Sequence, residues 1–428
     1  MSSASDAGTF LVAPRGNVQN LWLSIYVAIL IGKFGEWIPG LASVPLAKLA
    51  FLLTVVFTFR ARKNLPTVVV RNLPIAWPGI YFLALALISV VFSVYKGKSV
   101  MESYSVAITL LSLILLLKVT QTIADLERIF FALTVAAAGL ALATIFSYAG
   151  GRAQINGNFD PNDLAYGLVT ILPIIRALAV TATKHIQSQI LNGLAAATVG
   201  AVLLTGSRGG VVAIALEVLL IVAFPLSFAK GGGLKRFHPL RFIVTIGLVV
   251  GLILAMWGYV PMEIRQRVAT LVELQDDYNM TSAKDGRSGI WTRDVAAVWE
   301  RPIGYGLGTS EYVNGITGGH YRAPHNSFIQ ALVEEGALGG VLLSLGYLVA
   351  LVQLGKVTGR GGPARAPPNP KALLYARALR VSVAANLVAG FFLSHAYDAL
   401  LWIVIGICAT LVRIDRTPAV RKPPAAAI

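Results

Sequence analysis

Long apolar stretches recur along the whole chain, and most are near or above the length needed to cross the hydrocarbon of a membrane. Mostly short polar segments separate them, which leaves little room for a large soluble domain. Hydrophobic residues make up 56% of the sequence and charged residues 13%, with a mean hydropathy of +0.71. This is too little polar surface to cover a soluble globule of 428 residues. We therefore predict a single integral membrane domain over residues 1–428.

Helices are the expected form of these stretches, because unpaired backbone amides are too costly in lipid. The stretches also lack the alternation of apolar and polar residues that is typical of a membrane β-barrel. The predicted fold class is therefore all-α, a polytopic membrane protein with about 12 transmembrane helices. The expected ranges are 21–38, 43–59, 75–94, 100–117, 128–148, 163–182, 188–205, 209–228, 241–259, 326–354, 373–394 and 398–413.

The distribution of basic residues predicts the orientation. A net charge of +16 could indicate a nucleic-acid partner, but in a membrane protein Lys and Arg concentrate in cytoplasmic loops. An even number of helices places both termini on one side. If that side is the cytoplasm, most of the basic residues lie inside, among them Arg60, Arg62, Lys63, Lys230, Lys235, Arg236, Lys356, Arg360, Arg365 and Lys371.

Two loops are longer than the others. Residues 355–372 are rich in Gly, Pro and basic residues and are predicted to form a flexible cytoplasmic connector. Residues 260–325 are predicted to form a long periplasmic loop with short amphipathic helices near the membrane surface, around Met262–Leu274 and Ile290–Trp299. A loop of this length is more often functional than idle. The first twenty residues do not have the pattern of a signal peptide, so we expect none to be removed.

The polar motifs of the sequence converge on the external side. Residues 157–163, Gly-Asn-Phe-Asp-Pro-Asn-Asp, lie between the fifth and sixth predicted helices. They are compatible with a turn in which Asn162 or Asp163 caps the sixth helix. They are equally compatible with a role of Asp160 and Asn162 in substrate binding.

A second motif, Thr-Gly-Ser-Arg-Gly-Gly at residues 205–210, forms a very short turn between two apolar helices. An arginine at this depth needs water, a carboxylate or a phosphate, and its planar fork suits two phosphate oxygens. Arg208 is therefore a candidate phosphate ligand, although an arginine that reaches the lipid headgroups would fit the same position. The adjacent glycines favour a ligand, because they permit close approach to the backbone.

Two further motifs lie in the long loop and at its end. Gly-Arg-Ser-Gly-Ile-Trp at residues 286–291 begins an amphipathic helix and contributes Arg287. Arg265 and Arg293 lie near it in sequence, so several guanidinium groups could face one anion. Pro-His-Asn-Ser-Phe at residues 324–328 contributes His325 and Asn326 at the start of the tenth predicted helix.

His325 has two interpretations from its residue type alone. It would fit an interfacial anchor or a helix cap. A neutral imidazole is also the side chain best suited to take a proton from a sugar hydroxyl near neutral pH. Arginines beside it would neutralise a diphosphate leaving group without a metal. The outward loops contain no Asp-x-Asp pair and no His-x-x-x-His spacing, so neither a metal nor another cofactor is expected.

Two more motifs complete the series: Arg-Pro-Ile-Gly-Tyr-Gly-Leu-Gly at residues 301–308 and Glu-Gly-Ala-Leu-Gly at residues 335–339. In this order, the motifs resemble those of the O-antigen ligase and polymerase superfamily. The resemblance covers roughly residues 155–345. It implies a glycosyltransferase of the C-type membrane architecture in the bacterial inner membrane, with its active site facing the periplasm. Such ligases transfer a polysaccharide from undecaprenyl diphosphate to the lipid A-core oligosaccharide in lipopolysaccharide biosynthesis.

The resemblance also implies roles for individual residues. His325 would be the general base, Arg208 and Arg287 would hold the diphosphate, and Asp398 would match a carboxylate that orients the site. Direct displacement would invert the anomeric carbon. Other functions remain open: an O-antigen polymerase, a protein O-oligosaccharyltransferase, or a polysaccharide flippase or transporter. A transporter would be expected to carry ionisable groups near the bilayer midplane, whereas here the polar motifs gather on one face.

The predicted orientation can be tested by cysteine labelling. A cysteine introduced at Gly318 should react with a membrane-impermeant reagent in intact spheroplasts, and one at Gly361 should react only after lysis. The opposite pattern would place the polar motifs in the cytoplasm and exclude a periplasmic site.

Overall fold

The structure is a computed structural model that describes residues 18–38, 40–65, 73–155, 160–229, 233–256, 262, 265, 286–357 and 369–416. These residues form helices and connecting segments, and no β-strand occurs among them. The all-α prediction is thus confirmed for this part of the chain. The principal helices are α1 (Val18–Gly32), α3 (Leu46–Arg60), α4 (Ala76–Ser89), α5 (Lys96–Val119), α6 (Ile123–Phe146), α7 (Pro161–Thr181), α8 (His185–Leu204), α9 (Arg208–Ala223), α10 (Pro239–Met256), α13 (Arg287–Glu300), α14 (Ser310–Ile316), α15 (Ser327–Gly355), α16 (Pro370–Gly390) and α17 (Ala399–Arg416).

Each of the twelve predicted ranges overlaps one of these helices. Six helices are long and apolar enough to cross a membrane, namely α5, α6, α7, α8, α15 and α16. The chain therefore has the character of a multi-pass membrane protein. The number of crossings, the sidedness of the loops and the division of the chain stay predictions. Residues 358–368 of the predicted connector and most of the stretch from Met262 to Leu274 lie outside the described residues.

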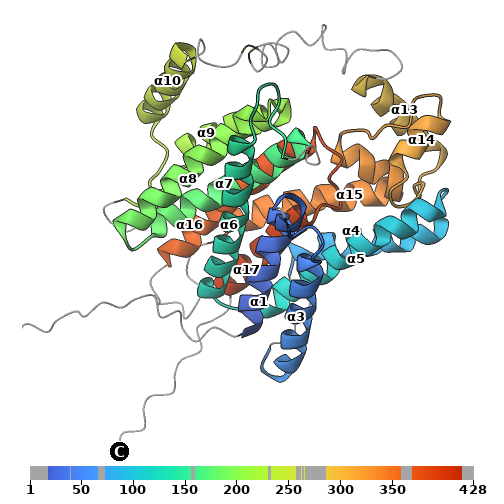
Figure 1. Cartoon of the computed structure of the whole chain (residues 1–428), viewed down its shortest axis with the longest axis horizontal. Helices are drawn as coiled ribbons and strands as arrows, with labels where there is room; N and C mark the ends of the chain where they lie inside the picture. Colours follow the sequence, from blue (N-terminus) through green and yellow to red (C-terminus); the bar gives the residue numbers. More distant parts are fainter. Residues whose placement is uncertain are drawn as a thin grey trace, which may run out of the picture.

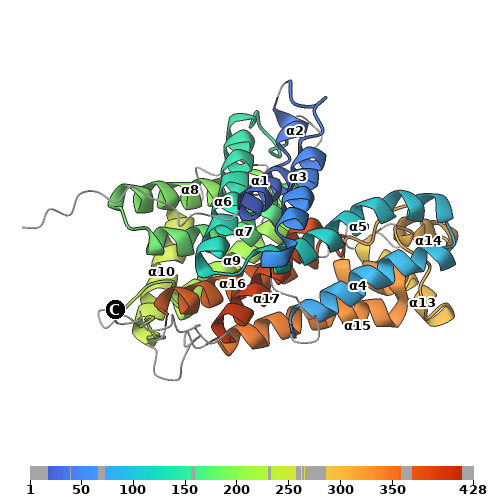
Figure 2. The same cartoon turned by 90° about the horizontal axis from the view of Figure 1, so that it is seen from below.

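The centre of the molecule is built from α7, α16 and α17, with α15 alongside (Figures 1 and 2). Almost every residue of α17 from Leu400 to Val412 is buried, which is typical of a helix enclosed by others on all sides. A polar network crosses this core, as Tyr347 of α15 donates to Asn386 of α16, which donates to Thr170 of α7. Such bonds between helices fix their mutual register in an apolar surrounding.

The helices α4, α5 and α15 run side by side, and the short helices α13 and α14 cover one end of this group (Figure 2). Helix α13 confirms the helix predicted around Ile290–Trp299. The end of the molecule that carries α13 and α14 also holds the starts of α5 and α15. Most of the polar motifs of the sequence therefore meet there or beside it.

Helix α15 is interrupted at Gly336, which the hydropathy pattern did not predict. Gly336 has φ 69° and ψ −166°, a conformation that breaks the helix into two parts. The segment of residues 301–308 fills the break with its own backbone. The amides of Tyr305 and Gly306 donate to the carbonyl oxygens of Val333 and Glu334 at 2.8 Å each, and the amide of Ala337 donates to the carbonyl of Pro302 at 3.1 Å.

These backbones approach each other so closely that side chains are excluded. A β-carbon on Gly304 would lie 2.5 Å from the carbonyl oxygen of Glu334, and one on Gly336 would collide with the carbonyl of Pro302. Both glycines also have positive φ, where L-residues with side chains are strained. Backbone pairing with α15 thus explains Gly304. The other two glycines of this motif are explained by different neighbours, since a β-carbon on Gly306 would meet Ser93 at 2.5 Å and one on Gly308 would meet Glu102 at 2.8 Å.

We expect Gly336→Ala to lower the free energy of unfolding by at least about 2 kcal/mol, because this backbone conformation is nearly restricted to glycine. The matched control is Gly346→Ala in the regular part of α15, where the new methyl would make only ordinary contact with Trp402 at 3.8 Å. Thermal unfolding in one detergent measures both variants. Equal melting temperatures would contradict the role of the break.

Candidate functional site

Two adjacent cavities lie where the starts of α7, α9 and α15 meet α13 and the loop of residues 391–398. The first has a volume of about 280 Å³ and the second about 510 Å³. Asp160, Asn162 and His325 line both of them. The two cavities therefore share a wall, and His325 is part of it.

The smaller cavity is rich in arginine and is called the arginine cavity below. Asp160 is the one acidic residue among its described lining. The four basic side chains come from separate segments of the chain: Arg152, Arg208, Arg287 and Arg322. Guanidinium groups bind phosphate oxygens in pairs, so the chemistry of this lining is compatible with a phosphate or diphosphate ligand.

Arg208 enters this cavity because a helix begins at it. Ser207 is the N-cap of α9, with its hydroxyl accepting from the amide of Gly210 at 3.3 Å. The glycines after Arg208 were expected to allow approach of a ligand. That expectation stays a prediction, and Gly206 and Gly209 do line the cavity. The glycines also allow close packing of the protein, since a β-carbon on Gly209 would meet Phe392 at 3.0 Å and one on Gly210 would meet Ala165 at 2.7 Å.

Arg287 is the first residue of α13, and its guanidinium lies 5.9 Å from the centre of the Phe392 ring. One turn further on, the Trp291 indole donates to the carbonyl oxygen of Pro324 at 2.7 Å. Trp291 therefore holds the residue that directly precedes His325. Two motifs that are far apart in the sequence become one structural unit through this bond.

His325 has an unusual backbone. Its φ is 49°, and the only other described residue with a side chain and positive φ is Lys33. The next residue, Asn326, is the N-cap of α15 and accepts from the amides of Phe328 and Ile329 at 2.9 and 3.1 Å. The cap is therefore Asn326, so His325 does not serve as one. Burial and then the positive charge of Arg287 lower the pKa of His325 below 6.5, which favours the neutral imidazole at neutral pH.

The larger cavity has six acidic residues among the twenty that line it and is called the carboxylate cavity. Its carboxyl groups are those of Glu102, Asp160, Asp163, Glu311, Glu334 and Asp398, and its cationic or titratable nitrogen groups are those of Lys98, His325 and His395. Lys98 pairs with Glu311 at 2.8 Å. Glu334 is fully buried and accepts from the backbone amides of Gly308 and Ser310.

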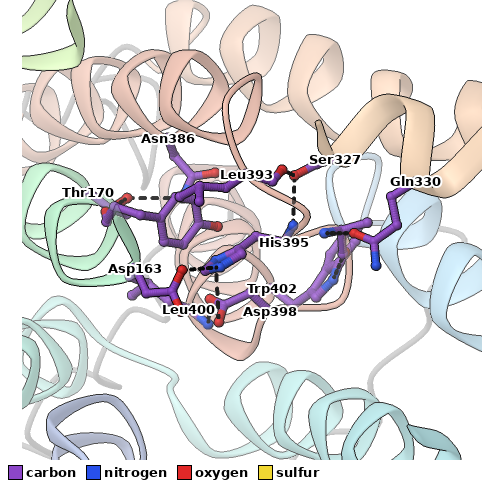
Figure 3. Close-up of polar contacts among 12 residues, drawn as sticks. Asp163, Thr170, Ser327, Gln330, Asn386, Leu393, His395, Asp398, Leu400 and Trp402 are labelled. Carbon is purple, nitrogen blue, oxygen red and sulfur yellow. Dashed lines mark hydrogen bonds and ion pairs between the residues drawn. The ribbon is translucent and has the colours of Figure 1, made fainter. Parts of the chain in front are cut away.

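The loop of residues 391–398 closes this cavity and is tied to the start of α15. Ser327 donates to the carbonyl of Leu393 at 2.8 Å and accepts from the amide of His395 at 3.0 Å (Figure 3). The amide of Ala396 donates to Gln330 at 3.2 Å. The residues after His325 thus hold the loop in place.

His395 lies between two carboxylates (Figure 3). Its Nε2 is 2.9 Å from Asp163 Oδ1, and its Nδ1 is 4.0 Å from Asp398 Oδ2. Burial alone would lower the pKa of His395, but the bond to Asp163 and the two negative charges raise it above its ordinary value. The two histidines of the site are therefore shifted in opposite directions, and His325 is the one suited to accept a proton.

The sequence-predicted residues divide into two groups. Arg208, Arg287, His325, Asp160 and Asn162 lie together in the arginine cavity, and Asp398 lines the carboxylate cavity. The cap of α7 is Asp160, which accepts from the amide of Asn162, and not Asn162 or Asp163 as the turn suggested. Asn162 accepts from Arg152 at 2.9 Å.

Two predicted arginines line neither cavity. Arg293 donates to the side-chain oxygen of Asn314 at 2.8 and 3.0 Å, which joins α13 to α14. Arg265 is a described residue, but it is absent from the lining of both cavities. A role of either residue toward a diphosphate stays a prediction without support from this geometry.

Four residues of the site were not singled out from the sequence: Arg152, Arg322, His395 and Glu334. Asp163 was considered only as a possible helix cap. Arg152 follows two glycines and Arg322 precedes the His325 motif, so their places near other motifs were a weak signal. His395 is separated from Asp163 by 232 positions, and no local pattern predicts that contact.

Among the described residues, no group of three or more His, Cys, Asp or Glu side chains is arranged to hold a metal ion. Asp276 and Asp277 lie outside the described residues. The prediction that no metal takes part stays a prediction.

The described residues thus form an apolar helical fold that holds an arginine cavity and a carboxylate cavity on either side of His325, as expected of a multi-pass membrane protein with a polar site at one end of its helices. Residues 193–344 match the family model described as O-Antigen ligase. The match supports the O-antigen ligase family and confirms the resemblance predicted from the motifs. It contains Arg208, Arg287, His325 and Glu334. Among curated proteins, none matches the chain.

The positive φ of His325 allows a catalytic role of its side chain to be distinguished from an effect on protein stability. If His325 acts as the general base of a glycan transfer, both His325→Gly and His325→Ala should lower the transfer rate by about 10²–10⁴-fold, the usual loss for a missing general base. His325→Gly should nevertheless be more stable than His325→Ala by about 1 kcal/mol, because glycine accepts positive φ. Melting temperatures and transfer rates measure the two effects.

The pH profile of the parent protein should follow the lowered pKa of His325. A general base acts in its deprotonated form, so if His325 is the base, kcat/KM, which reports the protein without substrate, should persist as pH falls through 6.5 and decline only below it. If activity in His325→Gly equalled that of the parent, or if activity followed melting temperature across the variants, His325 would not be the base.

Proposed function

We propose that this protein transfers a glycan from undecaprenyl diphosphate to a sugar hydroxyl, without a metal, and that it does so as an O-antigen ligase. The observation that carries this proposal is the position of His325 in the shared wall of the two cavities. A group transfer needs a leaving group on one side of the base and an acceptor on the other. The arginine cavity and the carboxylate cavity supply these two sides.

The donor diphosphate would occupy the arginine cavity. Arg208 and Arg287 come from the starts of two different helices, and Arg152 and Arg322 add two further guanidinium groups. Guanidinium groups bind phosphate oxygens in pairs and would stabilise the charge that develops as the diphosphate leaves. Arg152 is held by hydrogen bonds to Thr205 and Asn162, and Arg287 lies against the Phe392 ring, so these two need little reorganisation during the reaction.

The chemical step balances with groups of this chain alone. His325 takes the proton from the acceptor hydroxyl as the oxygen attacks the anomeric carbon of the donor. The bond from that carbon to the diphosphate oxygen breaks, and undecaprenyl diphosphate leaves with the electron pair. Attack from the side opposite the leaving group inverts the configuration of the anomeric carbon. A diphosphate is a good leaving group, so no general acid is required.

The family supports lipid-linked polysaccharide substrates and a membrane location. We infer that the acceptor is the lipid A-core oligosaccharide and that the cavities face the periplasm from the bacterial inner membrane. The acceptor distinguishes this function from that of a polymerase in the same superfamily, for which a second lipid-linked repeat unit would be the acceptor. Purified protein offered both acceptors decides between them.

The arginine cavity can be tested by a change that keeps the charge. Arg208→Lys should weaken binding of undecaprenyl diphosphate and lower transfer by at least about tenfold, because lysine lacks the planar fork. Arg287→Gln should behave similarly. The double variant should lose less than the two single losses combined if both arginines hold one diphosphate. Native mass spectrometry measures binding, and turnover of lipid-linked donor in reconstituted protein measures transfer.

The matched control is Arg416→Lys, at the far end of α17, where the guanidinium contacts Gln353 instead of either cavity. It should leave both measurements unchanged. Normal binding and normal transfer in Arg208→Lys would contradict a diphosphate site in the arginine cavity.

A further inference from the structure

The carboxylate cavity differs in charge from the arginine cavity on the other side of His325. Carboxyl groups in its lining outnumber basic and imidazole groups six to three. In the arginine cavity, four guanidinium groups face a single carboxylate. Glu311 and Asp163 are paired with Lys98 and His395, and Glu334 is fully buried against backbone amides. Among the described residues, the carboxyl groups of Glu102 and Asp398 have no ionic partner as close as these, so the lining on this side of His325 is acidic and the lining on the other side is basic.

One polar atom beside the carboxylate cavity lacks a partner. Ser394 Oγ is buried and has no hydrogen-bond partner among the described residues. Ser394 lines the cavity and belongs to the loop that Ser327 and Gln330 hold in place. Buried polar atoms without a partner are rare in proteins, and a bound ligand is one way in which they are satisfied.

The lining also suits one chemical class of ligand. Hydroxyl groups of a sugar can donate to the carboxylates of Glu102 and Asp398 and accept from the hydroxyl of Ser394. The volume of about 510 Å³ is within the roughly 300–1,000 Å³ that is typical of small-molecule sites. Phosphate or carboxylate groups on the sugar would be repelled by the same lining.

We propose that the carboxylate cavity binds the acceptor and selects a sugar terminus that is uncharged or carries an amine over one that carries a phosphate or a carboxylate. This inference rests on the proposed glycan transfer. It follows that charge alone directs each substrate to its own cavity: the diphosphate is attracted by the arginines and kept out of the carboxylate cavity. An amine on the acceptor gains an ion pair with a carboxylate such as Glu102.

Three methyl glycosides that differ at one substituent test the selection: methyl glucoside, methyl glucosaminide and methyl glucuronide. Their binding to the full-length protein in nanodiscs is followed by saturation-transfer NMR. The glucoside and the glucosaminide should bind, and the glucuronide should bind more weakly by on the order of tenfold, because one added like charge faces several partly buried carboxylates.

The variants Glu102→Gln and Asp398→Asn each remove one negative charge from the lining. They should reduce the preference for the glucoside over the glucuronide and weaken the glucosaminide. The matched control is Glu300→Gln, the same change at an exposed residue of α13 that lines neither cavity. It should leave the order of binding unchanged.

The outcomes separate this inference from the proposed function when binding of undecaprenyl diphosphate is measured in the same samples. In one outcome the protein binds the diphosphate, but the glucuronide binds as tightly as the glucoside or no glycoside binds. This overturns the inference about the carboxylate cavity and leaves the proposed donor site intact. In another outcome the glycosides bind in the expected order, but the protein does not bind the diphosphate. This contradicts the proposed donor site and leaves the inference about the carboxylate cavity intact. Unchanged selectivity in both cavity variants also overturns the inference, because the carboxylates would then not be its cause.

Discussion

The interruption of α15 at Gly336 is the constraint on which the site depends. A broken helix within an apolar fold needs new partners for its backbone groups, and residues 301–308 supply them. The same segment brings the amides of Gly308 and Ser310 to the buried carboxylate of Glu334. Through these bonds, α13 and α14 are held over the start of α15, and the wall that contains His325 is formed between them.

His325 owes its chemical properties to what lies on either side of it. Arg287 and burial favour its neutral form, while the nearby carboxylates of Asp160 and Asp163 act in the opposite direction and are outweighed. His395 lies against two carboxylates and is shifted the other way. The fold therefore lowers the pKa of His325 and raises that of His395, and the proposed transfer uses the neutral imidazole of His325. The positive φ of His325 stores strain at the same residue, as is common at functional sites.

The part of the site that was predicted from the sequence came from turns between apolar helices. Arg208, Arg287 and His325 each lie at or next to the first residue of a helix, where hydropathy and capping residues indicate the boundary. Their meeting in one cavity was implied by a family resemblance and is observed in the structure. Arg293 shows the limit of this reasoning, because its spacing from Arg287 suggested a shared anion, whereas the structure turns it toward Asn314.

Composition and hydropathy by themselves determined that the chain is helical and membrane-embedded, because the lack of polar surface and the cost of unpaired amides in lipid leave few other forms. They also determined where polar groups lie along the chain. Only the tertiary structure decided that α15 breaks at Gly336, that His395 meets Asp163, and that arginines and carboxylates lie on opposite sides of His325. These features depend on contacts between segments far apart in the chain, and a local pattern contains no information on which distant partner will satisfy a given backbone or side-chain group.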